Sequence, residues 1–308
     1  MKRTNVLVEG AILLALYIIL LLVTLYAPII SFITILLLAT PFIIFVFRHG
    51  WKQSISLVIA ACLLSFLAGT FVSVPMALMF STTGIVMAYF YRRQRPMYSL
   101  IGGTISFLIH FVAAYAVSIV YLGEDIFAET IEQTRSTINE TLELFPSLDE
   151  EAKKILAEQV NAQLNVFAYL LPSMFVVGSF ILTIVIHIIN QPILKRLKMN
   201  TGSLMPFRNW KFPTSIIWYY LIAVVLMFLN IPEGSFLYIA LLNLVFILRT
   251  LLLIQGFSFI FYFSYVKKFS KAIPILAVVV SFFIPILLYP VQILGIVDLG
   301  FNLRDKIR

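Results

Sequence analysis

Charged residues are scarce in this chain. Asp, Glu, Lys and Arg together make up 12% of its 308 residues, whereas hydrophobic residues make up 61%. A soluble domain carries roughly 25% charged residues. So few charged residues cannot cover the water-facing surface of a 308-residue protein. This composition therefore excludes an ordinary soluble domain and indicates that lipid surrounds most of the chain.

Cysteine and the common catalytic motifs are also missing. Cys62 is the single cysteine, which excludes a disulfide within the chain and argues against a thiolate metal site. The sequence contains no G-x-S-x-G, H-E-x-x-H, P-loop or C-x-x-C pattern. We therefore predict no catalytic residue, no metal and no cofactor, and a chain that is not an enzyme. The net charge of +8 suits anionic lipid head groups, and nothing indicates nucleic acid.

Long apolar segments fill most of the sequence. A bilayer core of about 30 Å requires about 20 apolar residues per helix. Candidate spans cover residues 9–27, 29–47, 53–72, 74–91, 97–122, 166–190, 214–230, 236–265 and 272–297. Pro28 separates the first two and predicts a tight hairpin, because proline disfavours helix for the residue before it. The sequence predicts an all-α, polytopic transmembrane helical bundle of eight or nine spans.

Basic residues cluster before the first span and after the second, fourth, sixth and eighth spans. They comprise Lys2 and Arg3, Arg48 and Lys52, Arg92, Arg93 and Arg95, Lys195, Arg196, Lys198, Arg208 and Lys211, and Lys267, Lys268 and Lys271. The positive-inside rule then places the N-terminus of this multi-pass protein in the cytoplasm.

The C-terminal tail does not fit this alternation. Nine spans would put Arg304, Lys306 and Arg308 outside, so either the tail is an exception or the count is even. The eighth segment, at about 30 residues, is long for one upright helix and short for two. The last segment contains Pro274, Pro285 and Pro290 and is a candidate for a kinked or re-entrant structure.

Residues 123–165 form an acidic insert. They hold ten acidic and three basic residues, so the net charge of this segment is 3 − 10 = −7. Phe127, Ile131, Ile138 and Leu142 recur at helical spacing, and Ser147 with Glu150 forms a capping-box pattern for a second helix. We expect an extracytoplasmic helical hairpin that either packs on the bundle or serves as a lid or docking surface.

The sequence thus divides into five parts. Residues 1–122 form an N-terminal bundle of five spans, 123–165 the acidic hairpin, and 166–190 the sixth span. Residues 191–213 form a basic cytoplasmic linker, and 214–308 hold the C-terminal spans.

A few polar side chains lie inside the spans. Arg249 is the deepest, and a charge at mid-membrane is expensive and usually faces the protein interior. It is a candidate for substrate binding or gating, or for a structural role. His110, His187, Asn243 and Gln255 are weaker candidates for the same substrate site, whereas Glu9 is placed at the head-group level.

Three pairs of small residues stand four apart. They are Ala11 and Ala15, Ser65 and Gly69, and Gly84 and Ala88. This spacing lets two helix backbones approach closely, either inside the bundle or at a partner interface.

Four stretches carry a resemblance to a known family. They are V-E-G-A-I-L-L-A-L-Y at residues 8–17, the acidic insert, L-I-Q-G-F at 253–257 and L-G-I-V-D-L-G-F-N-L-R at 294–304. With these the whole chain resembles the YybS-like family of bacterial membrane proteins, whose function is uncharacterised. The first six spans are distantly similar to the substrate-binding S components of energy-coupling-factor transporters. That resemblance implies that Ala11 and Ala15 contact a membrane coupling subunit, which works with an ATPase.

Three hypotheses follow from these patterns. The first is a membrane transport component with a solute pocket among the first six spans. The second is a non-transporting scaffold that docks envelope or signalling proteins. The third, an intramembrane enzyme acting on lipid-linked substrates, requires two or more of Arg249, His110, His187 and Glu9 to converge.

Overall fold

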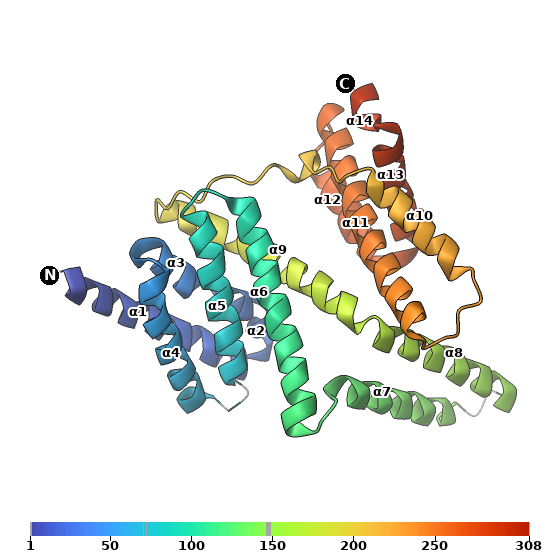
Figure 1. Cartoon of the computed structure of the whole chain (residues 1–308), viewed down its shortest axis with the longest axis horizontal. Coiled ribbons are helices and arrows are strands. Elements are labelled where there is room, and N and C mark those ends of the chain that lie inside the picture. The colour runs from blue at the N-terminus through green and yellow to red at the C-terminus, as the bar shows by residue number, and fades with distance from the viewer. Residues whose placement is uncertain (1, 70, 72, 146–148, 308) are drawn as a thin grey trace. The chain divides into compact units, whose positions relative to one another are not determined.

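The described part of the chain is helical throughout and falls into two compact units. The computed structural model describes residues 2–69, 71, 73–145 and 149–307, and gives only the backbone of residues 2–4 and 122. The first unit comprises Met1–Ile126 with Phe175–Leu204, and the second comprises Phe127–Met174 with Met205–Arg308 (Figure 1). The acidic insert therefore groups with the C-terminal helices, and most of the sixth span groups with the N-terminal helices.

Seven helices make up most of the first unit. They are α1 (Lys2–Tyr26), α2 (Pro28–Leu37), α3 (Thr40–His49), α4 (Trp51–Ala68), α5 (Ser73–Tyr91), α6 (Pro96–Val117), which continues into a π-helical turn at Ser118–Leu122, and α9 (Leu171–Arg196). The chain turns between α1 and α2 at Pro28, as the sequence predicts, and Thr24 and Thr34 meet across this turn with their hydroxyl oxygens 2.7 Å apart. Together α2 and α3 form one candidate span, Pro28–His49.

The core of the first unit combines aromatic rings with buried hydroxyl groups. Tyr17 packs edge-on against Phe42, with ring centroids 5.1 Å apart, and its hydroxyl lies 3.0 Å from the Ser65 hydroxyl. Phe80 packs in the same way on Phe107 at 5.5 Å. Large apolar side chains such as Ile12 and Ile19 lie on the outside. Because lipid is as apolar as leucine, such helices associate through close packing and hydrogen bonds rather than by burying apolar surface.

The second unit contains six longer helices and three short ones. The longer helices are α7 (Ile126–Glu143), α8 (Glu150–Tyr169), α10 (Ser215–Met227), α11 (Phe236–Val266), α12 (Ala272–Phe283) and α13 (Leu288–Phe301). The short ones are the 3₁₀ turns at Phe207–Asn209 and Pro285–Leu287, and α14 (Leu303–Lys306). The eighth predicted segment is a single unbroken helix, α11, of 31 residues.

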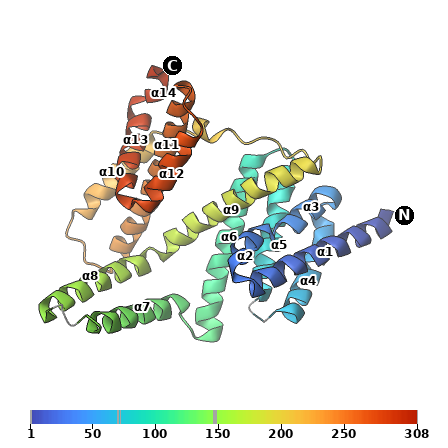
Figure 2. The same cartoon turned by 180° about the vertical axis from the view of Figure 1, so that it is seen from behind.

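The last predicted segment consists of two short helices that fold back on each other, in the form of a re-entrant hairpin. At 12 and 14 residues, α12 and α13 are about 18 and 21 Å long, shorter than a bilayer core of about 30 Å. Phe282, near the end of α12, stacks on Phe257, and Tyr289, in the first turn of α13, lies under the guanidinium of Arg249. Both contacts fall near the middle of α11, so the chain reverses there, at the Pro285–Leu287 turn, and returns to the end from which α12 starts (Figures 1 and 2).

This reversal brings the basic C-terminal tail back to the basic linker. Lys211 in the basic linker donates a hydrogen bond of 2.8 Å to the side-chain oxygen of Asn302, which places the tail beside the linker. Seven helices of the described residues are long and apolar enough to cross a membrane, and α10 is a shorter apolar helix. Helices α12 and α13 are further apolar helices below that length. Arg308 lies outside the described residues.

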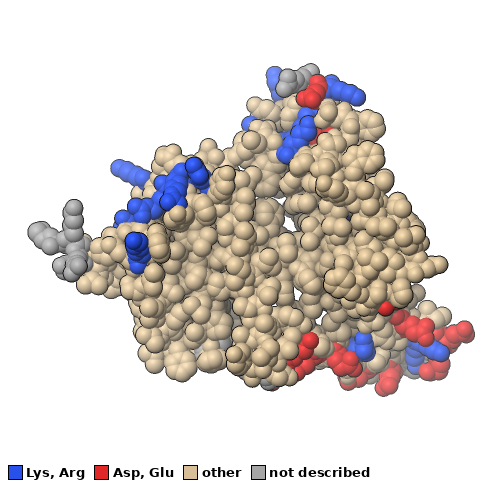
Figure 3. All heavy atoms as spheres, viewed as in Figure 1, with Lys and Arg blue, Asp and Glu red and all other residues tan. Residues whose placement is uncertain are grey.

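Charge is segregated within each unit. In the first unit, the basic loops after α3, α5 and α9 meet at one end, where Gly50 lies against the Arg92 guanidinium and Gly202 against the Gln94 carbonyl. In the second unit, acidic side chains gather on α7 and α8, while the linker and the tail carry basic ones at the far end of α11 (Figure 3). This separation is the pattern expected of membrane-spanning helices.

The acidic insert forms two exposed helices. Neither α7 nor α8 contains a buried residue among those described, and Arg135 joins them by a 3.4 Å hydrogen bond to Asn165. The predicted α7 stripe of Phe127, Ile131, Ile138 and Leu142 is half-buried. The start of the second helix differs from the prediction: Asp149 caps α8 by accepting from the Ala152 amide at 2.8 Å, and Ser147 lies outside the described residues.

Helices α11 and α13 touch backbone to backbone. A Cβ atom on Gly256 would overlap the carbonyl oxygen of Val291, and one on Gly295 would overlap that of Leu252. Glycine at both positions therefore lets the two helices approach more closely than any other residue would allow.

We predict that Gly256→Ala destabilises the protein, because the added methyl group must push α13 away from α11. Overpacking of this kind costs about 1–3 kcal/mol. The melting temperature of the detergent-solubilised protein measures the effect. Gly178→Ala in α9 is the matched control, because nothing lies within 4 Å of its added methyl group. An equal loss of stability in both variants would contradict the close approach of the two helices.

Candidate functional site

The five predicted substrate-binding residues are divided between the two units. His110 and His187 belong to the first unit, whereas Asn243, Arg249 and Gln255 follow one another along α11 in the second. The last three are separated by steps of six residues, about 9 Å each along a helix. Each of the five has its own partner within its own unit.

The two histidines are hydrogen-bonded inside the first unit. The Nδ1 atom of His187 lies 2.6 Å from the Tyr91 hydroxyl, and both side chains are buried. The Nδ1 atom of His110 lies 2.7 Å from the carbonyl oxygen of Ser106, and its Nε2 lies 3.2 Å from the Thr82 hydroxyl. These contacts tie α5 to α9 and to α6.

The Asn243 side chain hydrogen-bonds to two backbone groups where a neighbouring helix is interrupted. Its side-chain oxygen accepts from the Ser173 amide at 2.9 Å, and its side-chain nitrogen donates to the Tyr169 carbonyl at 2.7 Å. In an unbroken helix these two backbone groups would bond to each other. The Asn243 amide is thus inserted at the junction of α8 and α9, where Pro172 interrupts the hydrogen-bond ladder.

Arg249 and Glu9 also have partners. The Arg249 side chain is half-buried, and its guanidinium carbon lies 4.7 Å from the ring centroid of Tyr289, a cation–π contact at the level of the re-entrant turn. Glu9 pairs with Arg48 and His49 at the end of α3, where the basic loops of the first unit meet. Of the described contacts, none brings together two of the groups that an intramembrane enzyme would require.

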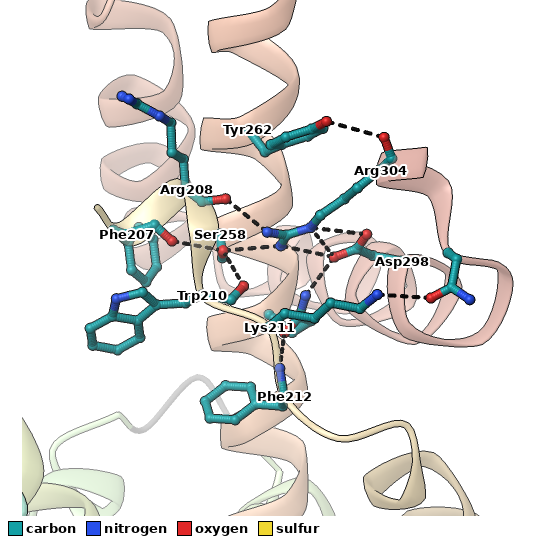
Figure 4. Close-up of polar contacts among 11 residues, drawn as sticks. Phe207, Arg208, Trp210, Lys211, Phe212, Ser258, Tyr262, Asp298 and Arg304 are labelled. Carbon is teal, nitrogen blue, oxygen red and sulfur yellow. Dashed lines mark hydrogen bonds and ion pairs between the residues drawn. The ribbon is translucent and has the colours of Figure 1, made fainter. Parts of the chain in front are cut away.

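The largest polar network surrounds a buried ion pair. Asp298, at the end of α13, is fully buried, and its side chain accepts from the Nε and Nη2 atoms of Arg304 at 2.9 Å (Figure 4). The side-chain nitrogen of Gln255 donates to the same carboxylate. The side-chain oxygen of Gln255 accepts from the Phe212 amide at 3.0 Å, so this residue joins α11, α13 and the linker.

The same ion pair holds the basic linker in place. Arg304 donates from Nη1 to the carbonyl oxygen of Arg208 at 2.8 Å and from Nη2 to the Ser258 hydroxyl at 3.1 Å. The Ser258 oxygen lies 2.8 Å from the carbonyl oxygens of both Phe207 and Trp210. Three separate parts of the chain (the linker, α11 and the C-terminal tail) therefore share one set of hydrogen bonds.

Asp298 and Arg304 were missed as site residues by sequence reasoning, although a signal was present. Ten of the 14 acidic residues lie in 123–165, so Asp298 is one of four elsewhere, and it directly follows an apolar run. Both residues belong to the C-terminal stretch 294–304, and Gln255 belongs to L-I-Q-G-F. The structure brings these two sequence-distant stretches into contact.

A groove lies next to this network in the second unit. Its volume is about 500 Å³, and it is lined by Pro206, Phe207, Arg208, Phe261, Ser264, Tyr265, Lys268, Phe269, Lys271, Pro274 and Ile275. The network itself is closed, since each charged group already has a partner. It positions the wall of the groove and exposes no free reactive group.

The predicted docking pair lies on the surface. Ala11 and Ala15 are exposed on α1, beside the exposed Ile12 and Leu16. The other two pairs point inward: Ser65 is buried against Tyr17, and Gly84 lies against the backbone of Ala39. Among the described residues of these pairs, Ala11 and Ala15 are thus the two that a partner helix can reach.

These features define a polytopic helical membrane protein. Among the residues that the structure describes, no group of three or more His, Cys, Asp or Glu side chains could hold a metal ion. Residues 15–299 match the family described as "Predicted membrane protein (DUF2232)", and the chain belongs to this family. It is 34% identical over the full length of both chains to the "Uncharacterized protein YybS" of Bacillus subtilis. The predicted YybS-like family is thereby confirmed. No solved structure matches the chain.

We predict that Asp298→Ala strongly destabilises the second unit, because it leaves the Arg304 charge buried without its partner. Breaking a buried ion pair in this way costs about 3–5 kcal/mol. The matched control is Asp305→Ala, which removes an exposed carboxylate seven residues along the chain and should change stability by less than about 0.5 kcal/mol. Melting temperatures in detergent compare the two, and equal losses would show that Asp298 has no special role.

We predict that Asn243→Ala also lowers stability, because it leaves the Tyr169 carbonyl and the Ser173 amide unpaired. Each unsatisfied buried group costs about 1–3 kcal/mol. Asn230→Ala is the control, since Asn230 is an exposed asparagine. Hydrogen exchange at the α8–α9 junction gives a second readout. Unchanged protection of the Ser173 amide would contradict the proposed bridge.

Proposed function

We propose that this chain is the docking subunit of a membrane transport complex, located in the bacterial cell membrane with its N-terminus in the cytoplasm. The observation that supports this function best is the exposure of Ala11 and Ala15 on α1. Small residues four apart on an exposed helix face allow a second helix to approach its backbone closely. The partner proposed for this face is a membrane-embedded coupling subunit that works with an ATPase.

The surroundings of the two alanines support a protein partner. Ile12 and Leu16 flank them and are 63% and 40% exposed. A partner helix that seats between such side chains gains van der Waals contacts along its length, and these contacts drive helix association in lipid.

The proposal does not depend on the five polar residues of the spans. His110, His187, Asn243 and Gln255 use their polar atoms in contacts with the chain itself, and Arg249 lies over Tyr289. A solute site built from them would have to replace these contacts. We therefore propose that docking, rather than these residues, defines the role of this subunit.

A scaffold that binds partners through the acidic helices is the second candidate function. It is favoured by the exposure of α7 and α8 and of two apolar side chains: Phe145, just after α7, is 52% exposed, and Ile155, on α8, is 49% exposed. A hollow of about 300 Å³ between α8 and the α10–α11 turn adds Glu158 and Glu233 to this surface. A surface of this kind suits a basic partner with apolar anchors.

The test is affinity purification of the tagged, full-length protein in mild detergent, followed by mass spectrometry of proteins and small molecules. We expect Ala11→Leu/Ala15→Leu to abolish recovery of a coupling subunit and its ATPase. The matched control is Ala113→Leu/Ala116→Leu, which adds the same bulk to exposed alanines of α6.

Each outcome separates the two functions. Loss of ATPase partners in the α1 variant alone supports the docking subunit. Recovery of envelope or signalling proteins that is unaffected by the α1 variant, but lost in Glu151→Lys/Glu158→Lys on α8, supports the scaffold instead. Recovery of the same proteins from all variants contradicts both interfaces.

A further inference from the structure

The groove beside the buried ion pair combines two kinds of lining. One side carries the cationic side chains of Arg208, Lys268 and Lys271, and no acidic residue lines it. The remaining wall is largely apolar and aromatic and includes Phe207, Phe261 and Ile275. Its volume of about 500 Å³ is in the range of small-molecule sites, about 300–1,000 Å³.

The positive charge of the groove is not neutralised by the chain. None of the ion pairs between described residues includes Arg208, Lys268 or Lys271. Asp298, a buried acid at this end of the unit, is bound to Arg304. Arg208 instead stacks over Tyr265, with its guanidinium carbon 3.9 Å from the ring centroid. This contact leaves the edge of the guanidinium, with its donors, available to an anion.

The ion-pair network fixes the cationic wall. Arg304 and Ser258 hold the carbonyl oxygens of Arg208 and Phe207, each at 2.8 Å. Figure 4 shows the Arg208 side chain pointing away from the ion pair that holds its backbone. The groove is therefore preorganised, which reduces the entropy that a ligand loses on binding.

Ile275, which lines the apolar part of the groove, lies on α12 next to other exposed apolar side chains. Ile275, Leu276 and Val279 are exposed there, at 53%, 58% and 44%. These residues lead from the cationic end of the groove toward the re-entrant turn near the middle of α11. A ligand that follows this path must be anionic at one end and apolar over the rest of its length.

We propose that the groove binds an anionic phospholipid of the surrounding membrane. The phosphate lies among Arg208, Lys268 and Lys271, and the acyl chains run along α12. The ligand is a lipid rather than free phosphate because most of the lining is apolar and would gain nothing from a small hydrophilic ion. Basic hollows between helices at the cytoplasmic face are a recognised setting for acidic head groups.

The proposal is tested by native mass spectrometry of the full-length protein in a non-ionic detergent. Phosphatidylglycerol and phosphatidylcholine with identical acyl chains are titrated separately. We expect phosphatidylglycerol to bind at least about tenfold more tightly than phosphatidylcholine. The double variant Lys268→Gln/Lys271→Gln should weaken phosphatidylglycerol binding about 25-fold, because each cation contributes about fivefold to the affinity. Equal binding of the two lipids overturns the proposal.

The matched control is Lys267→Gln/Lys306→Gln. It removes the same charge from exposed lysines at the same end of the unit, and neither lysine lines the groove. An equal loss of phosphatidylglycerol in both variants would show a general surface attraction and overturn the site. All four lysines are exposed, so the variants should keep the wild-type melting temperature, which is measured in parallel.

Two further arms separate a lipid from a free anion. Inorganic phosphate at millimolar concentration should leave phosphatidylglycerol bound. Ile275→Asn, which changes the apolar wall, should weaken phosphatidylglycerol binding severalfold. Displacement by inorganic phosphate, together with no effect of Ile275→Asn, would identify an anion site that takes no lipid and would overturn the proposal.

Discussion

The ion pair between Asp298 and Arg304 is the contact on which the second unit depends most. A charge buried in a membrane-embedded bundle is unfavourable unless each of its polar atoms has a partner. Here the carboxylate receives Gln255 as well as Arg304, and the guanidinium also donates to the linker backbone and to Ser258. Because these partners belong to α11 and to the linker, satisfying the two charges fixes α11, α13, the linker and the tail together.

Close packing and polar bridges support the same arrangement. Gly256 lets α13 approach the backbone of α11 one residue from Gln255, which brings the Gln255 amide within reach of Asp298. At the other end of α11, Asn243 completes the hydrogen bonds at the junction of α8 and α9. Helix α11 thus contacts most other parts of the unit, and it carries two polar side chains, Gln255 and Asn243, that hydrogen-bond to other segments. The polar residues of its interior serve the architecture.

Three surfaces are left free by this architecture. Ala11 and Ala15 lie on the surface of the first unit, the acidic helices α7 and α8 bury none of their described residues, and the basic groove is lined by cations without acids. All three follow from one constraint. Inside a bilayer-spanning protein, polar and small residues make the contacts and hydrogen bonds between helices. The residues that remain exposed are free to contact lipid or another protein.

The sequence by itself determined the membrane-spanning helical class, the turn at Pro28 and the acidic insert, because these depend on composition and on periodicities of a few residues. It also left open the side of the C-terminus, the form of the segments 236–265 and 272–297, and whether the polar residues meet. The tertiary structure decided the form of these two segments and the contacts that each polar residue makes. Whether prolines kink a helix or reverse it, and whether Asp298 finds Arg304, Gln255 and the linker, depends on contacts between residues distant in sequence. Helical periodicity reports only which residues share a face, and it carries no information about what that face will touch.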